Sequence, residues 1–210
     1  MDAAARAREI VKRLTPLYTD LTPALDHKSA YELLVATVLA AQCTDARVNI
    51  VTPEFFRRWP DPAALAQAMV GDVEDVVHST GFFRQKAKNL VAAAKRMVAL
   101  HGGAVPDTME ALTALPGVAR KTANIVLSNA LGKNEGIAVD THVRRLSFRL
   151  GLTSSDNPII IEKDMMPLFA RKDWGAINHL LVLHGRAVCK ARSPRCDACA
   201  LDDICPRRGL

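Results

Sequence analysis

Aromatic side chains are scarce in this chain, at 5% of its 210 residues, although 49% of the residues are hydrophobic. Sheets draw on aromatic and β-branched residues, whereas alanine and leucine favour helices, so this deficit argues against a sheet-based core. Helical periodicity runs through almost the whole sequence, and only the stretch GIAV at 136–139 looks extended. That stretch is too short to build a sheet. The sequence therefore predicts an all-α fold.

Long apolar runs are also missing. No segment approaches the roughly 18 consecutive apolar residues of a membrane span. The start, MDAAARAREIVKRL, mixes both charge signs at helical spacing and has no apolar core of a signal peptide. We therefore expect no membrane partner and a cytoplasmic location. Thiols are reduced there by default, so the five cysteines are not expected to form disulfides.

Turn signals divide the chain into short helices. Ser29 is placed as an N-cap, Asp107 and Glu110 have the spacing of a capping box, and the glycines of HGG at 101–103 end a long helix. The predicted helices are Ala3–Leu14, Ala30–Ala41, Ala46–Trp59, Pro62–Ala68, Val73–His78, Arg84–His101, Met109–Ala114, Val118–Leu131, Thr141–Leu150, Ile159–Phe169 and Trp174–Val188.

The C-terminal segment lacks helical periodicity and contains four cysteines with the spacing C-x6-C-x2-C-x5-C. A segment this short cannot bury enough apolar surface to fold alone, so four thiolates that bind a metal are expected to order it. Zinc usually takes two closely spaced cysteine pairs, whereas an iron–sulfur cluster accepts wider, uneven spacing. We favour the cluster and leave zinc open. The candidate ligands are Cys189, Cys196, Cys199 and Cys205, while Cys43 is expected in the core.

The formal net charge is +6, which suggests a polyanionic partner, although a solvated basic surface is the commoner explanation. Between the first two tail cysteines, the sequence KARSPR carries Lys190, Arg192 and Arg195. A metal-ordered loop with three cations is suited to contact phosphates. Alternatively, these cations only balance the negative charge of the cluster.

The stretch LPGVARKT, from Leu115 to Thr122, lacks the glycine–lysine pair of a phosphate-binding P-loop. Its pattern is helix, tight turn at Gly117, and a second helix that begins near Ala119, Arg120 and Lys121. The start of such a helix exposes unpaired backbone N–H groups, which can bind a DNA phosphate without reading a base. The sequence therefore predicts a helix-hairpin-helix element at residues 107–131.

LPGVARKTA, followed by VDTHV and the cysteine spacing of the tail, resembles the endonuclease III family of helix-hairpin-helix DNA glycosylases. AQCTDARVN, GFFRQKA and LHGRAVC match the same family in order, so the resemblance covers nearly the whole chain. It implies a two-lobed helical protein. Residues 23–133 would form a six-helix barrel, and residues 1–22 and 134–210 a discontinuous helical domain with a 4Fe–4S cluster loop at 189–205.

The resemblance also implies the activity, which is that of a bifunctional DNA glycosylase and AP lyase in base excision repair. The enzyme would remove oxidised pyrimidines from double-stranded DNA that contains damaged bases or abasic sites, as a monomer. Lys121 matches the family's Schiff-base lysine, and Asp140 its catalytic aspartate. A helix N-terminus, Arg120 and partial burial would all disfavour a protonated amine at Lys121, as a lysine nucleophile needs. Alone, Lys121 would be read as a solvated lysine and Asp140 as an N-cap.

Four further residues match positions of the family that face DNA. Gln42 matches the residue that fills the space left by an extruded nucleotide, and Phe82 stands where the family has an apolar wedge. Core packing beside Phe83 is the alternative for Phe82. Asp45 and His142 fall near the expected DNA-binding cleft with weaker support.

Two positions depart from the family pattern, and two other functions remain possible. Ala119 replaces the second glycine of the hairpin, and Ser193 replaces a frequent basic residue, so we expect changes in affinity only. An adenine-mismatch glycosylase would share the fold, but it lacks the lysine found here as Lys121. A non-catalytic helix-hairpin-helix module held together by zinc would not need Lys121 with Asp140.

Overall fold

The computed structural model of the chain describes residues 1–21 and 23–210. Thr22, the last residue of the expected segment 1–22, lies outside the described residues. Within the described part, all regular structure is α- or 3-10-helical and no strand occurs, so the predicted all-α fold is confirmed. None of the helices in this part combines the length and apolarity that crossing a membrane requires.

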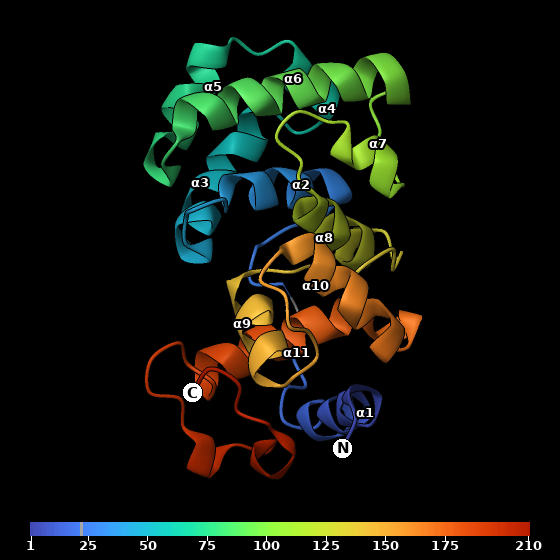
Figure 1. Cartoon of the computed structure of the whole chain (residues 1–210). Helices are drawn as coiled ribbons and strands as arrows, with labels where there is room; N and C mark the ends of the chain where they lie inside the picture. Colours follow the sequence, from blue (N-terminus) through green and yellow to red (C-terminus); the bar gives the residue numbers. More distant parts are fainter. Residues whose placement is uncertain (22) are drawn as a thin grey trace. The chain divides into compact units, whose positions relative to one another are not determined.

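The chain forms two compact units with separate hydrophobic cores. We call Pro23–Lys133 the continuous unit, and Met1–Thr22 together with Asn134–Leu210 the discontinuous unit. In Figure 1 the continuous unit runs from blue through green to yellow, and the discontinuous unit contains both chain ends.

The continuous unit is built around an apolar central helix. In α2 (Ala30–Leu39), eight of ten residues are buried, and a helix that is apolar all round must be covered on all sides. The long α6, in green in Figure 1, packs against α2, α4 and α5, while α8 packs against α2 and α7. The other helices of this unit are α3 (Asp45–Arg58), α4 (Pro62–Ala66), α5 (Val70–Val77), η1 (His78–Thr80), α6 (Phe83–His101), α7 (Met109–Thr113) and α8 (Arg120–Ala130).

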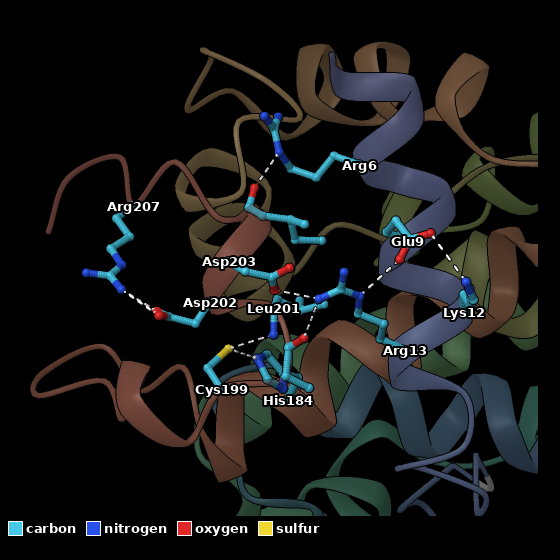
Figure 2. A network of polar contacts seen from close by, with 12 residues as sticks. Arg6, Glu9, Lys12, Arg13, His184, Cys199, Leu201, Asp202, Asp203 and Arg207 are labelled. Atoms are coloured by element: carbon cyan, nitrogen blue, oxygen red, sulfur yellow. Dashed lines mark hydrogen bonds and ion pairs between the residues drawn. The ribbon is translucent and has the colours of Figure 1, made fainter. Parts of the chain in front are cut away.

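The discontinuous unit joins the two ends of the chain. Arg6 Nε on α1 donates to the carbonyl of Ile204 at 2.9 Å. On the next turns of α1, Arg13 donates to the carbonyl of Ala200 at 3.1 Å and pairs with Asp203 at 2.5 Å, as Figure 2 shows. These bonds fix the first helix to the cysteine segment. The helices of this unit are α1 (Ala3–Leu14), α9 (Thr141–Arg149), α10 (Pro158–Met165), η2 (Met166–Leu168), η3 (Arg171–Asp173), α11 (Trp174–Ala187), η4 (Cys196–Ala198) and η5 (Asp202–Ile204).

Several predicted helix ends are confirmed and one cap is wrong. Ser29 caps α2 by accepting from the Glu32 N–H, and Gly102 ends α6 with φ of 60°. The capping box at Asp107 is not formed. Thr108 caps α7 instead, because its hydroxyl accepts from the N–H of Ala111 at 3.3 Å. Asp107 pairs with Lys133.

The turn between α7 and α8 depends on a glycine. Leu115 and Val118 are buried, and the Val118 N–H donates to the Leu115 carbonyl at 3.1 Å across the turn. Gly117 has φ of +79°, and a Cβ there would lie 2.8 Å from the Cβ of Asn89 on α6. The buried side chains of Leu115 and Val118, together with the glycine between them, therefore determine the direction in which the chain enters α8.

We predict that Gly117→Ala lowers the free energy of unfolding more than Gly132→Ala does. At Gly132, φ is +64° but nothing lies within 4 Å of an added Cβ, so only the left-handed backbone is penalised, by about 1–2 kcal/mol. At Gly117 the steric overlap adds to that penalty, by about 1 kcal/mol or more. Urea denaturation of both variants measures the difference, and equal losses would contradict the close packing on α6.

Candidate functional site

The first turn of α8 presents the predicted hairpin residues to solvent. Ala119 is the N-cap, with extended backbone (φ −83°, ψ 164°) and no side-chain cap bond, so alanine replaces the expected glycine without strain. Gly117, Ala119, Arg120 and Lys121 are all exposed. The helix start can therefore be reached by an anion. Partial burial was expected for Lys121, and this prediction is wrong because the residue is exposed.

Asp140 is held at the start of α9. Its Oδ1 accepts from the N–H of Val143 at 2.8 Å, which is the N-cap role that the sequence also allowed. The preceding residues Ile137–Val139 are buried, and Asn178 donates to the carbonyl of Ala138 at 2.7 Å. Buried residues before Asp140 and the cap bond to a residue after it thus fix the position of this half-buried carboxylate.

His142 packs where α9 approaches α11 closely. A Cβ on Gly185 of α11 would lie 2.8 Å from His142 Nδ1, so the small residue permits the contact. Arg145 Nη2 lies 3.1 Å from the same nitrogen. Because a guanidinium only donates, Nδ1 is the acceptor in this contact. Arg145 also donates to the carbonyls of Gly185 in α11 and Cys189 in the tail. The guanidinium therefore binds α11 and the tail and is not dedicated to Asp140.

Gln42 and Phe82 lie on exposed turns of the continuous unit. Gln42 follows α2 and has φ of 54°, and Phe82 precedes α6 with φ of 47°. Phe82 is 65% exposed, so the alternative that it belongs to the core is wrong. Phe83 packs instead, with its ring centroid 4.4 Å from that of His78. Asp45, in the first turn of α3, is half-buried.

The four tail cysteines line one cavity in the discontinuous unit. Its other walls are largely apolar and include Leu146, Leu150, Val188 and Pro194. Across residues 1–21 and 23–210, no three His, Cys, Asp or Glu side chains form a group that could hold a single metal ion. Four thiols around a shared apolar cavity fit a multi-atom cluster. Cys43 packs against the core of the continuous unit, as predicted.

N–H groups are directed at three of these sulfurs. Arg149 Nη1 lies 3.4 Å from Cys189 Sγ, and backbone N–H groups donate to the sulfurs of Cys199 and Cys205, each at 3.4 Å. Burial raises the pKa of the Cys199 and Cys205 thiols, and these backbone donors act in the opposite direction. Donors around the sulfurs favour thiolates, the form that binds metal.

His184 connects a tyrosine to the cysteine cavity, as Figure 2 shows in part. The Tyr18 hydroxyl lies 3.0 Å from His184 Nδ1, and His184 Nε2 lies 3.3 Å from Cys199 Sγ. Burial lowers the pKa of His184 and raises that of Tyr18, so both are neutral near pH 7. With the phenol donating to Nδ1, the proton on Nε2 faces the sulfur.

The basic loop of the tail is folded around Arg149. This buried guanidinium donates to the carbonyls of Lys190 at 2.7 Å and Ala191 at 3.0 Å. Arg195 Nη2 donates to the carbonyl of Ala187 at 2.6 Å. The side chains of Lys190 and Arg192 are exposed. All three predicted cations are exposed, and Arg195 also binds the last residue of α11.

Sequence reasoning missed Arg149, His184 and the buried Lys86. Each shares its helix with at least one other residue of its own type, and no local pattern distinguishes it. LHGRAVC contains His184, but only the fold reveals the bond to a cysteine fifteen residues later in the chain. A buried cation or imidazole is recognised by its partners, and these are distant in sequence.

A family model described as HhH-GPD superfamily base excision DNA repair protein matches residues 35–171. Endonuclease III of Synechocystis sp. is 52% identical over 201 residues, which cover 96% of this chain and 92% of that protein. Endonuclease III of Escherichia coli is 37% identical, with 96% of this chain and 95% of that protein covered.

Solved structures agree with the sequence comparisons. A trapped covalent intermediate of endonuclease III with DNA superposes with a TM-score of 0.92 at 36% identity, covering 99% of this chain and 97% of that one. A non-covalent endonuclease III–DNA complex gives 0.91 at the same identity, with the same coverage. A thermostable thymine-DNA glycosylase, at 21% identity and a TM-score of 0.85, shares the fold.

Proposed function

The chain belongs to the endonuclease III family of HhH-GPD base excision DNA repair proteins, and from this premise we propose that Lys121 and Asp140 carry out its chemistry. The protein is a DNA glycosylase with AP lyase activity. Its proposed substrate is double-stranded DNA containing oxidised pyrimidines or abasic sites. We further propose that it acts as a monomer in the bacterial cytoplasm. The bacterial origin of its relatives supports the assignment to bacteria.

The observation that carries the proposal is the exposed amine of Lys121 on the first turn of α8, directly after the Gly117 turn. In its neutral form, Lys121 Nζ bonds to the sugar C1′ while the bond from C1′ to the base breaks. The base leaves with the electron pair and takes up a proton. Opening of the sugar ring gives a Schiff base, and loss of a C2′ proton then expels the 3′ phosphate and cuts the strand.

Asp140 has a separate role in the proposed reaction. As the C1′–base bond breaks, positive charge develops on the sugar, and a fixed carboxylate stabilises it. The N-cap bond to Val143 supports this role because it orients the carboxylate before substrate binds. A preorganised charge needs little reorientation during the reaction.

DNA contacts are proposed for the exposed polar and apolar residues on both units. Gly117, Ala119 and Arg120 would hold a phosphate through the start of α8, and Lys190, Arg192 and Arg195 would contact another stretch of backbone. Gln42 would fill the vacated space while Phe82 separates neighbouring bases. Phe82 is supported by its exposed aromatic ring. For Asp45 and His142 we propose supporting positions beside the DNA.

Cys189, Cys196, Cys199 and Cys205 would hold a 4Fe–4S cluster. When bound, the cluster cross-links four points of a segment that has little apolar core of its own, and so orders the basic loop. The shared cavity and the N–H groups directed at the sulfurs support this assignment. A zinc-ordered module without activity is the alternative that the experiments below distinguish.

We expect Lys121→Ala to abolish covalent trapping of the protein on damaged DNA by borohydride. Only a Schiff base is reduced to a stable amine link, and alanine has no amine to form one. Gel electrophoresis of the trapped complex measures the outcome. Lys95→Ala, which removes an exposed lysine from α6, serves as the control and should trap normally. Trapping that survives in Lys121→Ala would move the nucleophile elsewhere.

Asp140→Asn should retain DNA binding and lose most base excision. Asparagine caps helices as well as aspartate does, so α9 should remain intact, whereas the charge that stabilises the developing cation is lost. We expect a decrease on the order of 100-fold or more in the single-turnover rate, with a similar dissociation constant. Single-turnover excision and a binding titration separate the two effects. An unchanged rate would remove Asp140 from the mechanism.

Cys196→Ser should lower the iron and sulfide content and the melting temperature of the purified protein. The tail then loses one of the four attachment points that order it. Cys43→Ser is the matched control, because Cys43 belongs to the other unit and should leave the metal content unchanged. Wild-type protein that contains zinc and no iron would contradict the cluster.

A further inference from the structure

Gln42 and Phe82 share an unusual backbone conformation. Among the described residues, they are two of only four non-glycine residues with positive φ, at 54° and 47°. This region is unfavourable for a residue with a side chain, so surrounding contacts must maintain it. We call residues 40–44 the Gln42 turn and residues 78–82 the Phe82 turn. The two turns are far apart in sequence and lie in the same unit.

Lys86 is the contact that these turns share. It lies on the first turns of α6 and its residue surface is only 5% exposed. Its Nζ donates to the carbonyl of Leu39, the last residue of α2, at 2.8 Å. It also donates to the carbonyl of Thr80, the last residue of η1, at 2.8 Å. One ammonium thus binds the chain just before the Gln42 turn and within the Phe82 turn.

The backbone of Lys86 completes the connection. Its N–H donates to the carbonyl of Phe82 at 3.1 Å, which is the first bond of α6. Thr80 is itself buried, and its hydroxyl donates to the Val77 carbonyl at 2.8 Å. The backbone N–H of Lys86 therefore restrains Phe82 directly. The ammonium of the same residue restrains Thr80, two residues before Phe82.

A buried lysine is a costly way to join helices. Burial lowers the pKa of Lys86, which reflects the loss of water around the ammonium. An apolar side chain would avoid this penalty, but it could not satisfy two carbonyls at the ends of helices. The lysine is therefore suited to hold two turns at a defined separation.

We propose that Lys86 is a positioning residue for nucleotide extrusion, which sets the relative placement of the Gln42 and Phe82 turns. The proposal rests on the proposed DNA-inserting roles of Gln42 and Phe82. Lys86 touches neither the substrate nor the reacting atoms. It acts through the two side chains that enter the base stack, so its removal should impair the unstacking step more than the chemistry.

Lys86→Met tests the proposal, since methionine is a long, unbranched side chain without the ammonium. The excision rate is measured in single turnover, per folded molecule and well below the melting temperature, on two substrates. One carries the lesion paired in a duplex, and the other carries it in an unpaired loop that needs little unstacking. We expect the rate on the paired lesion to fall by about tenfold to a hundredfold, because misplacement by about 1 Å costs up to this much. The rate on the looped lesion should fall much less.

Lys95→Met provides the matched control, because it removes the same charge from an exposed position of the same helix. It should leave both rates unchanged. A purely structural role for Lys86 would leave both rates per folded molecule unchanged or lower them equally, and either result would overturn the proposal. If Lys86→Met does not fold, Lys86→Gln, which keeps N–H donors on a shorter uncharged side chain, is measured on the same two substrates with the same criteria.

A double-mutant cycle with Phe82→Ala gives a second readout. If Lys86 acts through Phe82, adding Lys86→Met to Phe82→Ala should lower the paired-lesion rate by a smaller factor than it does in the wild type. Equal factors would overturn the proposal. Failure of the proposed function looks different, since wild-type protein would then neither excise bases nor be trapped by borohydride. An active enzyme with normal rates in Phe82→Ala and Gln42→Ala would instead reject the inserting roles, and with them the role of Lys86.

Discussion

Cationic side chains that donate to main-chain carbonyls hold several irregular segments of this protein in place. In an all-helical fold, the carbonyls at helix ends and in turns have no ladder partner, and burying them without a donor is costly. Lys86 satisfies the ends of α2 and η1, and Arg149 satisfies the loop after Cys189. Arg6 and Arg13 do the same for Ile204 and Ala200 in the cysteine segment. These segments carry the proposed DNA contacts and cluster ligands.

The cysteine segment shows why this interaction is needed. Only short 3-10 turns form between Cys196 and Cys205, and only Leu201 and Ile204 of these ten residues are buried. Arg13 of α1 donates to the Ala200 carbonyl of this segment, and His184 Nε2 lies 3.3 Å from Cys199 Sγ. His184 and the four tail thiols line the same cavity. N–H donors are directed at three of the four tail sulfurs, and in the proposed cluster site they would favour the thiolate form against the effect of burial.

The sequence predicted the elements of the site better than their environment. Lys121 was found because a glycine turn, a helix start and the family motif coincide within nine residues. The burial of its side chain was predicted wrongly, since exposure depends on what packs over a helix and not on the helix itself. The capping box at Asp107 failed for a related reason. The adjacent Thr108 caps α7, while Asp107 pairs with Lys133 from beyond α8.

The sequence by itself determined the all-helical fold, the hairpin turn and the set of four tail cysteines. These follow from periodicity, from glycine's backbone freedom and from the spacing of thiols, all of which are local. Only the tertiary structure decided that Phe82 is exposed while Phe83 packs, and that Lys86, Arg149 and His184 are buried among specific partners. Such assignments depend on residues far apart in the chain, 47 positions between Lys86 and Leu39 and 166 between His184 and Tyr18, and no local pattern encodes those separations.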